Sequence, residues 1–83
     1  MYLVNSNPII TNVIISENIS GENFGYGGGM NLDDSNPTLT HVTISNNMAG
    51  VGGGMNLEYS NPTLTNLDIT ENIADIGGGM YLD

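Results

Sequence analysis

The chain has 83 residues and carries nine Asp and Glu but no Lys or Arg, which gives a formal charge of −9. Without cationic side chains it has no means of binding phosphates, so we expect neither nucleic acid nor an anionic membrane surface as a partner. It has no cysteine, which excludes disulfides and thiolate metal sites, and no apolar run approaches the roughly 20 residues of a membrane span. We expect one small domain, and no membrane insertion by this segment.

One motif recurs along the chain at a regular interval. Three glycines, Met, one further residue and Leu begin at Gly27, Gly52 and Gly77, which are 25 residues apart. Met1-Tyr2-Leu3 is a further copy without its glycines. A motif that returns at such a period is the sequence signature of a repeat architecture.

Each Met-x-Leu segment leads through Ser-Asn-Pro, a turn signal, into alternating Val, Ile, Leu and Thr that predict strands. In the second copy we predict strands at 30–32, 38–40 and 42–45. Glycine triplets, prolines and β-branched residues at these intervals exclude helices. Stacked coils place like residues directly above one another, which a meander of hairpins does not explain. The sequence therefore predicts an all-β parallel β-helix.

The predicted solenoid has about three coils of 25–29 residues, with three short strands per coil. Coil 1 covers residues 1–29 with a four-residue loop insertion, coil 2 residues 30–54 and coil 3 residues 55–79, followed by a closing strand at 80–83. Since Met1 aligns with the methionines of the repeat, we expect the chain to be part of a longer solenoid. End coils without caps expose apolar and strand edges, which predicts end-to-end self-association.

The alternation also predicts which side chains point into the solenoid. The expected inward columns are Met1, Met30, Met55 and Met80; Leu3, Leu32, Leu57 and Leu82; Ile10, Leu39 and Leu64; Val13, Val42 and Leu67; Ile15, Ile44 and Ile69; and the small Ser20, Ala49 and Ala74. Two more columns are expected at turns: Asn12, His41 and Asn66, and Asn18, Asn47 and Asn72. Stacked Asn side chains hydrogen-bond between coils and tolerate left-handed backbone.

Coil 1 carries its four extra residues within 19–26. Insertions in solenoids go to loops on one face, often the binding face. Glu22, Asn23, Phe24 and Tyr26 are therefore candidates for ligand contacts. The alternative is a loop whose aromatic side chains fold back over the edge of the coil.

A column of carboxylates follows the Met-x-Leu segments. Val4, Asp33, Glu58 and Asp83 share this column, and Asp34 lies beside it. Carboxylates stacked about 5 Å apart repel one another unless solvent screens them or a cation lies among their oxygens. Asp33, Asp34, Glu58 and Asp83 are thus candidate calcium ligands, with a solvated acidic edge as the alternative. No other cofactor is expected.

We expect no enzyme activity, because the chain offers no Lys or Arg as a base and its one histidine occupies a turn column. His41 stands where Asn12 and Asn66 stand in the other coils, and that column contains no acidic residue. Paired threonines, such as Thr38 and Thr40, form outward ranks that leave ice binding as a minor alternative, although Ile9 breaks the first rank.

The glycine motif, together with an Ile-x-x-Asn segment that ends at Asn18, Asn47 and Asn72, resembles the paired motifs of right-handed parallel β-helix repeat proteins of bacterial surfaces. It is similar to the repeats of chlamydial polymorphic outer membrane proteins. The resemblance implies a right-handed coil and a non-catalytic structural or adhesive module, secreted or displayed at the bacterial outer membrane. There it would contact a protein or glycan on a cell surface. A carbohydrate-binding or carbohydrate-active β-helix fragment, similar to polysaccharide lyases, is the second function left open.

Overall fold

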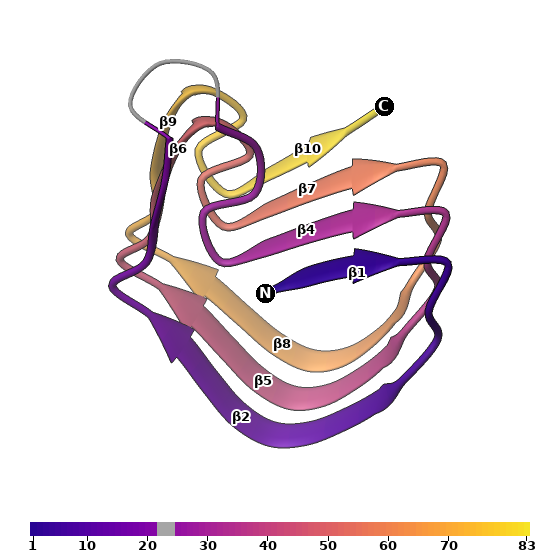
Figure 1. Ribbon diagram of the computed structural model, residues 1–83. Helices are drawn as coiled ribbons and strands as arrows, with labels where there is room; N and C mark the ends of the chain where they lie inside the picture. Colours follow the sequence, from indigo (N-terminus) through magenta and orange to yellow (C-terminus); the bar gives the residue numbers. More distant parts are fainter. Residues whose placement is uncertain (22–24) are drawn as a thin grey trace.

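The computed structural model describes residues 1–21 and 25–83, and every regular element in them is a β-strand (Figure 1). The strands are β1 Tyr2–Val4, β2 Ile9–Ser16, β3 Ile19–Ser20, β4 Met30–Asp33, β5 Thr38–Ser45, β6 Met48–Val51, β7 Met55–Glu58, β8 Thr63–Thr70, β9 Ile73–Ile76 and β10 Met80–Leu82. Figure 1 shows the coils stacked with equivalent strands above one another.

Three parallel sheets run along the stack. Their strand orders are β1-β4-β7-β10 in the first sheet, β2-β5-β8 in the second and β3-β6-β9 in the third. The pairs join residues at the same place in neighbouring coils, such as Leu3 with Leu32 and Ile10 with Leu39. The predicted parallel β-helix of about three coils, with three strands in each, is therefore confirmed.

The division of a coil into strands differs from the prediction at one corner. The segments predicted as separate strands at 38–40 and 42–45 form the single strand β5, and His41 between them has a φ of 53°. Asn12 and Asn66 have the same left-handed conformation in β2 and β8. Pairing continues on both sides of these residues. One left-handed residue thus bends the strand without ending it, as at a bulge.

The third side of each coil is a strand where the sequence predicts only a turn that leads to the glycines. β6 pairs with β3 and β9 through Met48 and Ala49, which lie just after Asn47. Ala49 and Gly50 in this strand have low β-propensity, so local sequence gives little strand signal here. The strand forms because neighbouring coils offer their backbone groups in register.

The predicted inward columns form the core. In coil 2, Met30, Leu32, Leu39 and Ile44 are completely buried, and Val42 is 1% exposed. Members of the same columns at the ends of the stack are open: Met1 is 49% exposed, Leu64 39% and Leu82 67%. The end coils therefore expose the apolar edges that the sequence predicts.

The glycine triplets make the tight corner that leads into the first sheet. The first glycine of each triplet, for example Gly52, is left-handed, with φ between 61° and 66°. A Cβ on Gly53 would lie 2.5 Å from the Gly78 carbonyl oxygen and 2.6 Å from that of Ile73. The Gly53 N–H donates to the Gly77 oxygen at 3.1 Å, so the backbones of successive coils approach closely here. A side chain at Gly53 would therefore clash with the backbone of the next coil.

Candidate functional site

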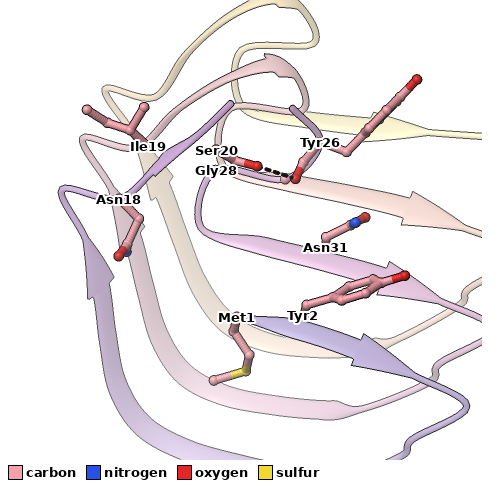
Figure 2. Close-up of a pocket in the computed structure, with 9 residues that line it drawn as sticks. Met1, Tyr2, Asn18, Ile19, Ser20, Tyr26, Gly28 and Asn31 are labelled. Atoms are coloured by element: carbon pink, nitrogen blue, oxygen red, sulfur yellow. Dashed lines mark hydrogen bonds between the residues drawn. The ribbon is translucent and has the colours of Figure 1, made fainter. Parts of the chain in front are cut away.

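A groove of about 430 Å³ lies where the first strand, the start of the third sheet and the first glycine corner meet (Figure 2). Its lining residues are Met1, Tyr2, Asn18, Ile19, Ser20, Tyr26, Gly27, Gly28 and Asn31. Two tyrosines and two asparagines supply its largest polar side chains, and Asn18 among them belongs to the asparagine column described above. Figure 2 shows Asn31 between Tyr2 and Tyr26 in the view onto this groove.

The fold fixes each of these three residues differently. Tyr2 on β1 pairs in register with Asn31 on β4, because both occupy the middle position of the Met-x-Leu segment. The Asn56 Nδ2 of the next coil donates to Asn31 Oδ1 at 2.9 Å, which orients the Asn31 amide. Tyr26 forms a parallel bridge to Val51, and its carbonyl oxygen accepts from Ser20 Oγ at 3.0 Å. The groove is therefore held by backbone and side-chain bonds on both sides.

Asn56, the buried member of this amide pair, lacks one hydrogen-bond partner. Asn56 is 3% exposed, and its Oδ1 has no hydrogen-bond partner in the described part of the chain. The next position of the column is Tyr81, which has no amide to donate into the stack. The pairing of amides in this column thus joins Asn31 and Asn56 and ends at Asn56.

The described residues that line the groove carry aromatic, amide, hydroxyl and aliphatic side chains and include no His, Cys, Asp or Glu. Tyrosine combines an apolar ring face with a hydroxyl, and an amide both donates and accepts hydrogen bonds. Together they suit a ligand with alternating apolar and hydroxylated surfaces.

Of the four candidate residues in the insertion, the structure describes only Tyr26. Tyr26 lines the groove and is 52% exposed, whereas Glu22, Asn23 and Phe24 lie outside the described residues. Sequence reasoning missed Tyr2 and Asn31, although the Met-x-Leu alignment already places them in one column. The sequence alone does not show that this column lies close to Tyr26 across the glycine corner.

The acidic side chains predicted to share a column occupy equivalent positions in neighbouring coils. Asp33 pairs in register with Glu58, and the Asp83 N–H donates to the Leu57 oxygen at 2.9 Å. Asp34 lies outside this column, at a left-handed corner with a φ of 47°. Within residues 1–21 and 25–83 no three or more His, Cys, Asp or Glu side chains converge so that they could hold a metal ion. The geometry therefore gives the calcium hypothesis no assembled site.

A second groove, also of about 430 Å³, lies on the outer side of the second sheet and is lined by His41, Thr43, Asn66 and Asp68. It brings a carboxylate near the histidine, which the column comparison misses because Asp68 lies two residues beyond Asn66. In the described part of the chain no hydrogen bond joins the side chains of these four residues to one another.

The threonine ranks are in register, since Thr38 pairs with Thr63 and Thr40 with Thr65. Ile9, which is 80% exposed, occupies the first rank as the sequence indicates. Ice binding stays a prediction.

Comparison of the chain with protein-family models, with curated proteins and with solved structures gives no significant match. In the described part of the chain no helix is long and apolar enough to cross a membrane.

Proposed function

We propose that the chain is a non-catalytic structural or adhesive β-helix module of a secreted or surface-displayed bacterial protein. Its coils form a rigid support on which contact residues are displayed. The resemblance of the repeat motifs to those of bacterial surface proteins supports the export and the adhesive role. The fold supports the structural role.

The observation that carries the proposal is that the repeated polar side chains hydrogen-bond from one coil to the next. Asn36 Oδ1 accepts from the Asn61 N–H at 2.6 Å, and the Ser60 Oγ accepts from the Ser35 N–H at 2.9 Å. Asn47 bonds to Asn18 and Asn72 in the coils on either side. These side chains link successive coils, so the residue types that often perform chemistry are here committed to structure.

Turnover assays on the whole chain test the absence of catalysis. We expect no lyase activity on acidic polysaccharides and no hydrolysis of model esters or glycosides. The informative variants are His41→Asn and Asp68→Asn, which remove the only imidazole and the nearby carboxylate of the second groove. Activity above background that both variants abolish would overturn the proposal.

Carbohydrate binding is the second candidate function, and the groove between Tyr2 and Tyr26 favours it. Sugar rings present apolar faces that stack on aromatic side chains and hydroxyls that bond to amides such as Asn31. A glycan array followed by titration calorimetry of any hit tests this. Tyr2→Ala and Tyr26→Ala should each weaken binding at least about tenfold. Tyr59→Ala is the matched control, because Tyr59 is 72% exposed and lies outside the groove. Equal losses in all three variants, or no hit on the array, would count against it.

A further inference from the structure

The outer face of the third sheet carries a row of exposed apolar side chains. Ile19, Met48 and Ile73 occupy equivalent positions on β3, β6 and β9 and pair in register. Their side chains are 72%, 45% and 61% exposed. We call these three residues the apolar column.

The exposure of the apolar column is lateral and does not arise at the ends of the stack. Met48 lies on β6, which has β3 on one side and β9 on the other. The next residue of this strand, Ala49, is only 6% exposed, so Ala49 faces the core and Met48 faces outward. Because the pairing is in register, all three members of the column stand on the same face of one sheet.

An outward strand position that faces water usually carries a polar residue. The second sheet follows this rule in coil 2, where the outward residues are Thr38, Thr40 and Thr43. In the apolar column the side chains are large and apolar in every coil, and they stack about 4.8 Å apart. Contiguous apolar side chains on an outer surface mark a surface that a partner covers.

Carboxylates border the apolar column. Glu17 and Glu71 lie two residues before its first and last members, at left-handed corners with φ values of 58° and 54°. Asp75 lies two residues after Ile73 in β9, so strand alternation places it on the same face. All three acidic residues are exposed, and the chain has no Lys or Arg that could neutralise them.

This border selects the kind of partner that the column can accept. Two copies of the chain, each with a formal charge of −9, would bring their carboxylates together without compensation. An anionic lipid surface is repelled for the same reason. A partner with Lys or Arg beside apolar side chains matches both parts of the surface, since its apolar groups cover the column and its cations meet the carboxylates.

The spacing of the column selects the conformation of the partner. Two steps from coil to coil cover about 9.6 Å. Residues i and i+7 of an α-helix are about 10.5 Å apart along its axis, with i+3 or i+4 between them on the same face. Alternate residues of an extended strand are about 6.6 Å apart and drift out of step with the coils. A helix that lies along the stack therefore matches the column.

We propose that the apolar column binds a basic amphipathic helix of a partner protein. The apolar stripe of the helix lies along Ile19, Met48 and Ile73, and its Lys or Arg side chains lie over the acidic border. This goes beyond the function proposed above, because it assigns a partner of stated chemistry to a face that the groove between Tyr2 and Tyr26 does not explain.

Fluorescence anisotropy with a labelled peptide of Leu, Ala and Lys tests the proposal. The peptide has about 18 residues, enough to form a helix, with its leucines on one stripe and lysines beside them. We expect it to bind the whole chain, and we expect a peptide of the same composition with the leucines scattered around the helix to bind at least about tenfold more weakly. No binding, or equal binding of the two peptides, overturns the proposal.

Substitutions in the column test where the peptide binds. Met48→Thr combined with Ile73→Thr should weaken binding at least about tenfold, and threonine suits an outward strand position. Ile19 stays unchanged because it also lines the first groove, which keeps this test separate from carbohydrate binding. Ile14→Thr is the matched control, since Ile14 is 74% exposed on the second sheet and coil 2 has Thr43 at that position. Equal losses in the control overturn the proposal.

The acidic border is tested by neutral substitutions that leave the column intact. Glu71→Gln combined with Asp75→Asn should weaken binding about threefold at low salt, and the loss should shrink as salt is added. Asp33→Asn combined with Glu58→Gln removes the same charge from the first sheet and should weaken binding by less than about 1.5-fold. Equal losses in the two double variants would show that only net charge attracts the peptide, and would overturn the proposal.

Two other occupants of the column are distinguished by separate measurements. A dimer in sedimentation equilibrium that Met48→Thr with Ile73→Thr abolishes would assign the column to a second copy of the chain. Flotation with phosphatidylcholine vesicles that the same double variant abolishes would assign it to a lipid surface. We expect neither, and either result overturns the proposal.

Discussion

Two columns of the repeat use the same amino acid for different physical reasons. The column Asn18, Asn47 and Asn72 is a ladder of side-chain hydrogen bonds, in which Asn47 is only 1% exposed. The column Asn12, His41 and Asn66 is exposed, and its members share left-handed φ values of 58°, 53° and 52°. In the ladder the amide matters, whereas at the exposed corner the backbone conformation matters. This difference explains why a histidine replaces asparagine in one column only.

The residues that turn the chain beside the ladder are not its asparagines. Glu17, Asn46 and Glu71, one position earlier, have the left-handed φ values there. The sequence predicts both inter-coil hydrogen bonds and left-handed backbone for each asparagine column. The structure separates them, and substitutions should separate them further.

The largest effect is expected for Asn47→Ala. Asn47 Oδ1 accepts from both the backbone N–H and Nδ2 of Asn18, and Asn47 Nδ2 donates to the Ile15 and Asn72 oxygens. Removal leaves several buried groups without partners, each at roughly 1–3 kcal/mol, so the free energy of unfolding should fall by about 4 kcal/mol. Urea denaturation followed by circular dichroism measures it. A loss below about 1 kcal/mol would show that the ladder is dispensable.

The glycine corner offers a third case, in which available space decides. A Cβ on Gly54 would lie 2.4 Å from the Gly79 oxygen, whereas the nearest atom to a Cβ on Gly79 is Ile69 Cγ2 at 3.6 Å. Gly54→Ala should therefore cost about 3 kcal/mol, because the coils must separate to admit the methyl group. Gly79→Ala, the same substitution in the same column, should change stability by less than about 0.5 kcal/mol. Thermal unfolding of the pair checks this, and similar losses in both would contradict the close approach between coils.

At the exposed corner, Asn66→Ala should cost about 1 kcal/mol, because a left-handed conformation is unfavourable for alanine. Asn66→Gly should be nearly neutral, since glycine adopts this conformation without a Cβ penalty. The contrast between these two variants in denaturant titrations isolates the backbone contribution. If glycine were as harmful as alanine, the Asn66 side chain itself would be needed.

The smallest effect is expected for His41→Asn. Asparagine adopts left-handed backbone more readily than most residues, so this variant should be equally stable or more stable by about 0.5 kcal/mol. Differential scanning calorimetry would detect the shift. A clear destabilisation would instead indicate that the His41 imidazole makes a contact worth keeping, with Asp68 across the second groove as the first residue to test by Asp68→Asn.

The 25-residue repeat was sufficient to predict the parallel coils, the inward columns and their register, because stacking places like residues together. It could not predict that a left-handed His41 bends β5 without ending it, since such a residue also ends strands elsewhere. β6 was missed because Ala49 and Gly50 have low β-propensity. Of the groove, only Tyr26 was singled out, through its insertion. The approach of Tyr2 and Asn31 depends on how two sheets meet at the glycine corner, which no local pattern encodes.

The in-register stacking of equivalent residues also determines how far apart contacting residues lie along the chain. Residues paired in register between neighbouring coils are 29 or 25 positions apart in a chain of 83. Such non-local pairing raises the contact order, and a high contact order slows folding. A whole coil must close before its first ladder bond can form, and each added coil repeats that closure. Refolding should therefore be slow for so small a protein, and it should accelerate once one pair of coils has formed.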